Sequence, residues 1–205
     1  MVKADQKHLP RLDAREYRGE AFVHWTFSLQ DRKTGRPEDR KTGWLIPAFY
    51  YKFRELLTHT AFRYRVTSPI FCLMPDHIHL VLIGIDARSD QLKATKYLRK
   101  HLNLVLGKMD CRLQHQPHDR VLRDDEKKED AFSDLVEYIA RNPERAGLVA
   151  EHDYKKYKYT ASLVPGYPEL ELWQNDFWPR FWKAYSFLKT HGLFRPSDEN
   201  LDRPS

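Results

Sequence analysis

Two histidines separated by one residue stand in an apolar segment, at His77 and His79 of DHIHLVLIGI. Residues two apart on a β-strand point to the same side of a sheet, so both imidazoles would project from the face that Val81 and Ile83 share. Two imidazoles that converge in this way can form half of a site for a divalent metal ion. The same pair is also compatible with two hydrogen-bonded histidines at a sheet edge that bind no metal.

A second polar group follows about 60 residues later, in the segment YIARNPERAGLV. Apolar residues at helical spacing predict an amphipathic helix over 129–141. At about 100° per residue, Tyr138 and Asn142 lie some 40° apart at one border of the apolar stripe, where a hydroxyl group can reach over a sheet. Tyr138 is equally compatible with an ordinary amphipathic tyrosine. Asn142, which precedes Pro143, is as compatible with the N-cap of a new helical turn as with a metal ligand.

The segments MPDHIHLVL and YIARNPERAGLV, with a basic helix and DRVLR between them, resemble the REP-associated tyrosine transposases of bacteria. These proteins belong to the single-tyrosine HUH transposase group, and the resemblance runs from about residue 21 to 160. It implies a nuclease that cuts hairpin-forming single-stranded DNA through a 5′-phosphotyrosine link. It further implies His77 and His79 as the metal-binding pair, Tyr138 as the nucleophile and Asn142 as the residue that completes the metal site.

The donor types favour Mg²⁺ or Mn²⁺ as the metal. Two imidazoles and one amide oxygen leave positions open for phosphate and water, and Mn²⁺ accepts such a mixed set. Zinc would prefer a third histidine, a cysteine or a carboxylate. The sequence contains no Walker-type phosphate loop, which fits strand transfer that keeps its bond energy in a phosphotyrosyl link.

Basic residues cluster near both motifs and are candidates for contacts with DNA phosphates. A helix predicted over 90–109 has an apolar face that includes Ala94, Leu98 and Leu102, with lysines on the opposite face. These lysines either face DNA or form a solvated surface. The predicted phosphate contacts are Lys93, Lys96 and Lys100, together with Arg141 and Arg145 beside Tyr138.

The predicted elements run in the order βαββαβ, followed by a further helix. The strands are expected at 21–30, 64–74, 77–85 and 119–123, and the helices at 46–62, 90–109 and 129–141. This order predicts an α+β, ferredoxin-like (RRM-like) antiparallel sheet with helices on one face, plus the extra catalytic helix. Residues 1–20 are predicted to be a polar arm and 21–160 the nuclease domain. Residues 161–205 are predicted to be an extension packed on or beside the core, with an aromatic helix after Asp176 that is more typical of core than of base stacking.

Two copies of DRKTG, at 31–35 and 39–43, predict an enlarged solvated loop. The net charge of +6 and the pI of about 9.2 favour a polyanionic partner. No apolar run is long enough for a membrane helix, and the N-terminal residues lack the apolar region of a secretory signal. With only two cysteines, the composition favours a cytoplasmic protein, expected to be a monomer or a homodimer.

Two other functions remain compatible with the sequence. One is a non-catalytic, domesticated nucleic-acid-binding protein on the same RRM-like fold, which would have no use for His77, His79 and Tyr138 together. The other is a metal-dependent phosphodiesterase that attacks with activated water, in which Tyr138 is only structural. A covalent protein–DNA adduct would exclude the phosphodiesterase.

Overall fold

The structure, a computed structural model of the chain, describes residues 11–30 and 44–193. The two DRKTG copies and the first ten residues of the predicted N-terminal arm lie outside the described residues. The rest of that arm is packed rather than free, because Tyr17, in a short 3-10 helix over Ala14–Tyr17, is fully buried beside Trp25.

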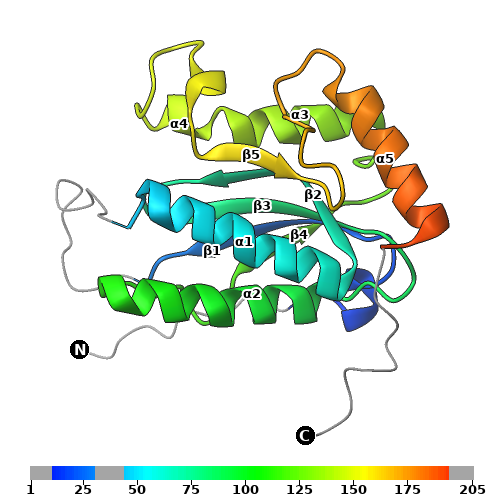
Figure 1. Cartoon of the computed structure of the whole chain (residues 1–205), viewed down its shortest axis with the longest axis horizontal. Coiled ribbons are helices and arrows are strands. Elements are labelled where there is room, and N and C mark those ends of the chain that lie inside the picture. The colour runs from blue at the N-terminus through cyan, green and yellow to red at the C-terminus, as the bar shows by residue number, and fades with distance from the viewer. Residues whose placement is uncertain (1–10, 31–43, 194–205) are drawn as a thin grey trace, which may run out of the picture.

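Five strands form one antiparallel sheet in the order β4-β1-β3-β2-β5 (Figure 1). Their bounds are β1 Phe22–Ser28, β2 Val66–Leu73, β3 His77–Gly84, β4 His118–Val121 and β5 Thr160–Leu163. The first four confirm the predicted strands within a few residues. The edge strand β5 was missed, and it forms by pairing with β2, a long-range contact that the local sequence does not indicate.

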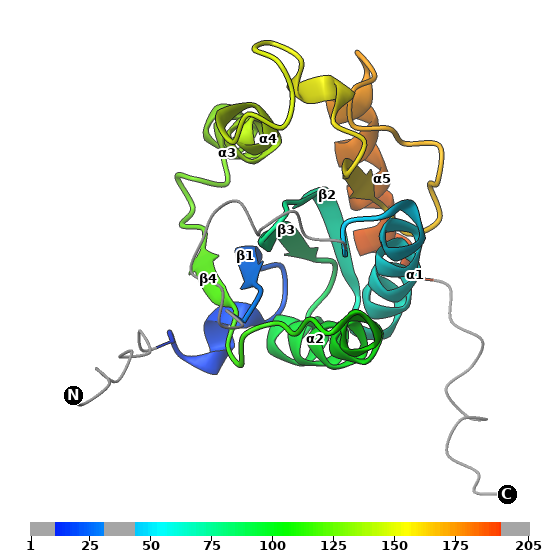
Figure 2. The same cartoon turned by 90° about the vertical axis from the view of Figure 1, so that its left-hand side faces the viewer.

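Helices cover both faces of the sheet, as the predicted ferredoxin-like core with extra helices requires (Figure 2). Helices α1 (Pro47–Tyr64) and α2 (Gln91–Leu106) lie side by side on one face. Helices α3 (Glu129–Ala140) and α5 (Phe177–His191) lie on the other, and the short α4 (Asn142–Arg145) follows α3. The α+β prediction is confirmed. None of the helices among residues 11–30 and 44–193 is both long and apolar enough to cross a bilayer.

Successive side chains of β1 point to opposite faces of the sheet and so contact different helices. Trp25 points toward α2, where its indole Nε1–H donates to Oε1 of Gln91 at 3.0 Å. Phe22 points the other way and meets Phe132 of α3 edge to face, with ring centroids 5.4 Å apart. It also stacks on Trp182 of α5. The aromatic stripe of α5 is therefore core, as its spacing predicted, and it fixes α3 against the same face of the sheet.

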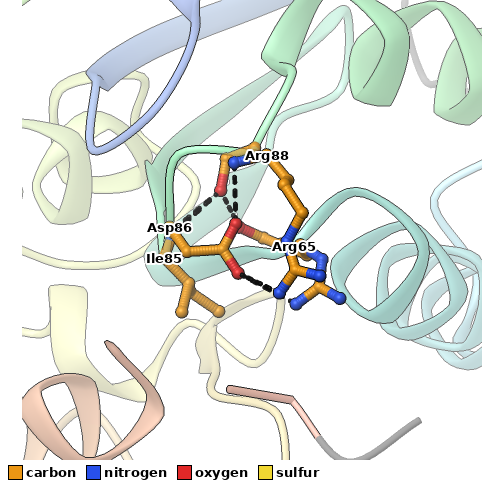
Figure 3. A network of polar contacts seen from close by, with 5 residues as sticks. Arg65, Ile85, Asp86 and Arg88 are labelled. Atoms are coloured by element: carbon orange, nitrogen blue, oxygen red, sulfur yellow. Dashed lines mark hydrogen bonds and ion pairs between the residues drawn. The ribbon is translucent and has the colours of Figure 1, made fainter. Parts of the chain in front are cut away.

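The ends of α1 and β3 are joined by a charged network (Figure 3). Helix α1 ends at Tyr64, and the left-handed backbone of the next residue, Arg65 (φ 56°), turns the chain into β2. Its nearly buried guanidinium donates to the Asp86 carboxylate at 2.9 Å, and Arg88 donates to the same oxygen at 3.1 Å. Burial alone would raise the pKa of Asp86, but the backbone N–H and guanidinium of Arg88, together with Arg65, hold it below its usual value. This network links the residue that follows α1 to the turn that follows β3.

Candidate active site

His77 and His79 project from β3 toward the face of the sheet that carries α3. They pair with Ser28 and Thr26 of β1, which share that face with Phe22, the partner of α3. The two Nε2 atoms are 2.9 Å apart, and the rings are perpendicular. The predicted convergence of the two imidazoles on one face is therefore what the structure shows.

Each imidazole of the pair has a partner at its other nitrogen. Nδ1 of His77 lies 2.6 Å from the carboxylate of Asp76, which can only accept a proton, so the proton of His77 lies on Nδ1. Nδ1 of His79 lies 3.0 Å from Nε2 of His24 on β1. His24 was missed from the sequence. The signal that could have found it is a lone histidine in the apolar strand segment AFVHWTFSLQ.

Burial keeps the inner histidines neutral. It lowers the pKa of His79 to about 3, and the neighbouring His77 and His24 add to this effect. Burial likewise lowers the pKa of His24 to about 4, helped by the charge of Arg120. A neutral imidazole offers a lone pair to a metal, so the protonation state of His79 at neutral pH is the one that a ligand needs.

The spacing of the two Nε2 atoms fits an octahedral ion. Ligands at right angles, each about 2.1 Å from the metal, are roughly 3.0 Å apart. Tetrahedral ligands at zinc distances are roughly 3.3 Å apart. The observed 2.9 Å, which is also an ordinary hydrogen-bond distance, would let one ion contact both nitrogens but does not select among these metals. Within the described residues no group of three or more histidine, cysteine and carboxylate side chains could hold a metal ion.

Tyr138 lies on the exposed side of α3. Half of its surface is accessible, and the guanidinium of Arg145 lies over its ring at 4.5 Å. Arg145 also donates to the carbonyl of Tyr138 at 2.9 Å. A shallow hollow of about 250 Å³ surrounds the ring, lined by Asp134, Glu137, Tyr138, Arg141 and Arg145. In the part of the chain that the structure describes, no hydrogen bond or ring contact joins Tyr138 to His77 or His79.

Asn142 is the first residue of α4, and its side chain turns back onto α3. Its Nδ2 donates to the carbonyls of Tyr138 and Ile139, at 3.2 and 3.1 Å. The alternative in which Asn142 is an N-cap is wrong: Arg141 occupies that position, and Asn142 instead satisfies carbonyls at the end of α3. With the amide nitrogen held in this way, Oδ1 is the atom left for a metal. Its ligand role stays a prediction.

The basic residues that were predicted to contact DNA lie on both faces of the sheet. Arg141 and Arg145 lie with Tyr138, although Arg141 is held by Glu137 at 2.8 Å and lies over the ring of Tyr154. The three lysines are exposed on α2, on the face of the sheet opposite to the histidines (Figure 2). The structure therefore does not bring these lysines into the histidine site.

The three lysines are not equivalent. Lys93 pairs with the N-cap Asp90 at 3.3 Å, whereas Lys96 lines a cavity of about 350 Å³. Arg11, Arg99 and His115 line the same cavity. Arg11 is neutralised by Asp119 at 3.0 Å. Partial burial and the charges of Arg112 and Arg11 lower the pKa of Arg99, as expected for a cation that lacks a nearby anion.

The fold and the histidine pair define an α+β protein with an antiparallel sheet and a candidate divalent-metal site on its α3 face. Among solved structures, a REP-associated tyrosine transposase bound to a REP hairpin has a similar fold, with a TM-score of 0.58. The similarity covers 76% of this chain and 82% of that chain, at 15% sequence identity. No protein-family model and no curated protein matches the sequence. The shared fold agrees with the predicted one, and the roles of individual residues rest on the geometry of this chain.

Proposed function

We propose that this protein is a metal-dependent single-stranded DNA endonuclease and strand transferase, a transposase-type enzyme with Tyr138 as its nucleophile. The observation that carries the proposal is the His77–His79 pair. Both rings have a partner at Nδ1, and their Nε2 atoms lie 2.9 Å apart, so that one ion could contact both. Partners at Nδ1 that fix the orientation of both rings are typical of histidines that bind a metal through Nε2.

The chain's own residues would divide the reaction between them. His77 and His79, with Oδ1 of Asn142, would hold Mg²⁺ or Mn²⁺, which supplies polarisation of a non-bridging oxygen of the scissile phosphate. The hydroxyl of Tyr138 would attack phosphorus and lose its proton while the bond to the 3′ oxygen breaks and that oxygen takes up a proton. A 5′-phosphotyrosine and a free 3′-hydroxyl result, and attack by another 3′-hydroxyl reverses the step and joins strands. Arg145 places positive charge against the ring on which phenolate charge develops.

Binding of a folded DNA strand would use both basic regions. Arg141 and Arg145 lie beside Tyr138 and would contact the phosphates that flank the scissile one. The cavity of Lys96 and Arg99 lies on the opposite face, and its excess positive charge favours a second stretch of phosphate backbone. A hairpin, with a stem and a single-stranded flank, offers two such stretches, which supports hairpin-forming DNA as the substrate class. Lys93 and Lys100 lie outside the lining of this cavity and would add further attraction to DNA phosphates.

Tyr138 makes no hydrogen bond or ring contact with the histidine pair in the described residues, so its hydroxyl would reach a phosphate at the pair either within one chain or from a second copy. Mixing two inactive variants tests this. If Tyr138→Phe and His77→Ala together restore cleavage, the nucleophile acts on the metal site of a partner copy. If the mixture stays inactive, the side chain acts within one chain.

The proposal is tested by looking for the covalent intermediate. Labelled hairpin DNA with a single-stranded flank is incubated with the protein and Mg²⁺ or Mn²⁺, and a denaturation-resistant protein–DNA band is measured. Wild type should form it, whereas Tyr138→Phe, His77→Ala, and wild type in excess chelator should not. Tyr51→Phe is the matched control, because Tyr51 is a 69% exposed tyrosine on α1, on the other face of the sheet.

Two results would redirect the interpretation. An adduct that persists in Tyr138→Phe moves the nucleophile to another tyrosine, such as Tyr154. Cleavage without any adduct favours the activated-water phosphodiesterase, and DNA binding without cleavage favours the domesticated binding protein on the same fold.

A further inference from the structure

Four side chains form one continuous line of contacts across β3 and β1. The Asp76 carboxylate contacts Nδ1 of His77, Nε2 of His77 contacts Nε2 of His79, and Nδ1 of His79 contacts Nε2 of His24. The three contacts measure 2.6, 2.9 and 3.0 Å. Thr26 Oγ1 also lies near Nδ1 of His79, but at 3.5 Å, so His24 is the stronger partner.

The protons on this line can be arranged in two ways. His77 carries its proton on Nδ1 in both, because the carboxylate of Asp76 accepts it. In the first arrangement His79 donates from Nε2 to His77, and His24 donates from Nε2 to Nδ1 of His79. Every contact is then a hydrogen bond, and the lone pair of His77 is occupied.

In the second arrangement His79 carries its proton on Nδ1 and donates it to Nε2 of His24, which now carries its own proton on Nδ1. The Nε2 lone pairs of His77 and His79 then face each other at 2.9 Å, which is repulsive unless a cation lies beside both. Only this second arrangement can bind a metal. The change between the two moves one proton within each of two neutral rings and leaves the net charge of the line unchanged.

We propose that His24 is a positioning residue for the metal site. When metal binds, Nε2 of His24 accepts a hydrogen bond from Nδ1–H of His79. When metal leaves, Nε2 of His24 carries a proton again and donates a hydrogen bond to Nδ1 of His79. This inference rests on the proposed metal-binding role of His77 and His79. A side chain at position 24 must both donate and accept for this purpose. Imidazole does so by changing tautomer, and an amide can do so by turning over. A carboxylate, which only accepts, would fix one arrangement, and an apolar ring would leave Nδ1–H of His79 with Thr26 alone.

The first measurement is metal affinity without DNA, followed by the electron paramagnetic resonance of free Mn²⁺. His24→Phe should bind Mn²⁺ about 10- to 100-fold more weakly than wild type, the usual effect of removing a partner that orients a metal ligand. His24→Gln, which can donate and accept, should recover most of the affinity. His101→Phe is the matched control, because His101 is a partly buried histidine on α2 that bonds the Tyr97 carbonyl and lies across the sheet.

The second measurement is the tautomer of His24 by nitrogen-15 NMR of the imidazoles, with Mg²⁺ as the diamagnetic metal. The proton of His24 should lie on Nε2 in the metal-free protein and on Nδ1 after Mg²⁺ is added. A merely structural role would leave the tautomer unchanged. Thermal unfolding of each variant shows whether β1 remains intact, and His24→Gln tests the role if His24→Phe fails to fold.

The possible results separate this inference from the proposed function. If His77→Ala loses Mn²⁺ binding while His24→Phe binds as wild type does, the role of His24 is refuted and the metal site stands. An unchanged His24 tautomer in the presence of bound Mg²⁺ also refutes it. If wild-type protein binds neither metal, the metal site itself is refuted, and the role of His24 with it.

Discussion

Replacing Lys96 and Arg99 together with alanine should weaken DNA binding in a salt-dependent manner. Both side chains line the cavity of about 350 Å³ beside α2 together with Arg11, whose charge is paired with Asp119, and the described residues that line this cavity include no carboxylate. The cavity therefore has an excess of positive charge that a phosphate would neutralise. Neither side chain is in the apolar core, so the double variant should unfold at nearly the wild-type temperature.

The size of the effect follows from counterion release. Each phosphate contact contributes roughly 0.9 to the slope of log affinity against log salt on duplex DNA, and roughly 0.7 on a single strand. Two lost contacts should reduce the slope by about 1.8 if a hairpin stem occupies the cavity, and by about 1.4 if a single strand does. Between about 50 and 200 mM salt, the wild-type affinity should fall by roughly one power of ten more than that of the variant.

The measurement is a fluorescence-anisotropy titration of labelled hairpin DNA at several salt concentrations. Lys93→Ala/Lys100→Ala is the matched control, because it removes the same net charge from the same helix without altering the lining of the cavity. That control should weaken binding slightly and change the slope by much less. Equal slopes of log affinity against log salt for the two double variants would refute the reasoning. The α2 face would then attract DNA only through its overall positive charge.

Three further predictions concern the scaffold that holds the site. Asp86→Asn should destabilise the protein by about 1–3 kcal/mol in denaturant unfolding, because the nearly buried Arg65 guanidinium loses its anion. The pKa of Asp86 is lower in the folded protein than in the unfolded chain. Asp86 therefore stabilises the folded state above the unfolded-state pKa near 3.9, and this stabilisation is lost as the pH falls through the lower folded-state pKa. An acid-unfolding profile of Asp86→Asn identical to that of wild type would contradict this. Phe132→Ala should cost about 3–5 kcal/mol and loosen α3, with faster amide exchange there than in α2. Gly84→Ala should fail to fold or should distort the end of β3, because a Cβ there would stand 1.8 Å from the carbonyl oxygen of Gly19, and a crystal structure with an unmoved backbone would show this to be wrong.

Much of the fold could be predicted from the sequence because the main elements carry strong local patterns. The apolar period of α2 and α3 and the period-two placement of His77 and His79 depend only on helix and strand geometry. These patterns are enough to specify an α+β sheet, the shared face of the two histidines and the burial of the aromatic stripe of α5. They require no knowledge of which elements are neighbours.

What only the tertiary structure decided is which residues meet across elements. His24 lies 55 positions before His79 in the chain and becomes its partner only because β1 pairs with β3 in one register. The lysines of α2 have the right charge for DNA, yet they face away from the histidines, because α2 packs on the other side of the sheet. Tyr138 shows the same limit, since a border position on a helix leaves open whether its hydroxyl turns over the sheet or toward solvent. Local spacing sets the direction of a side chain relative to its own element, whereas the packing of elements sets what that side chain reaches.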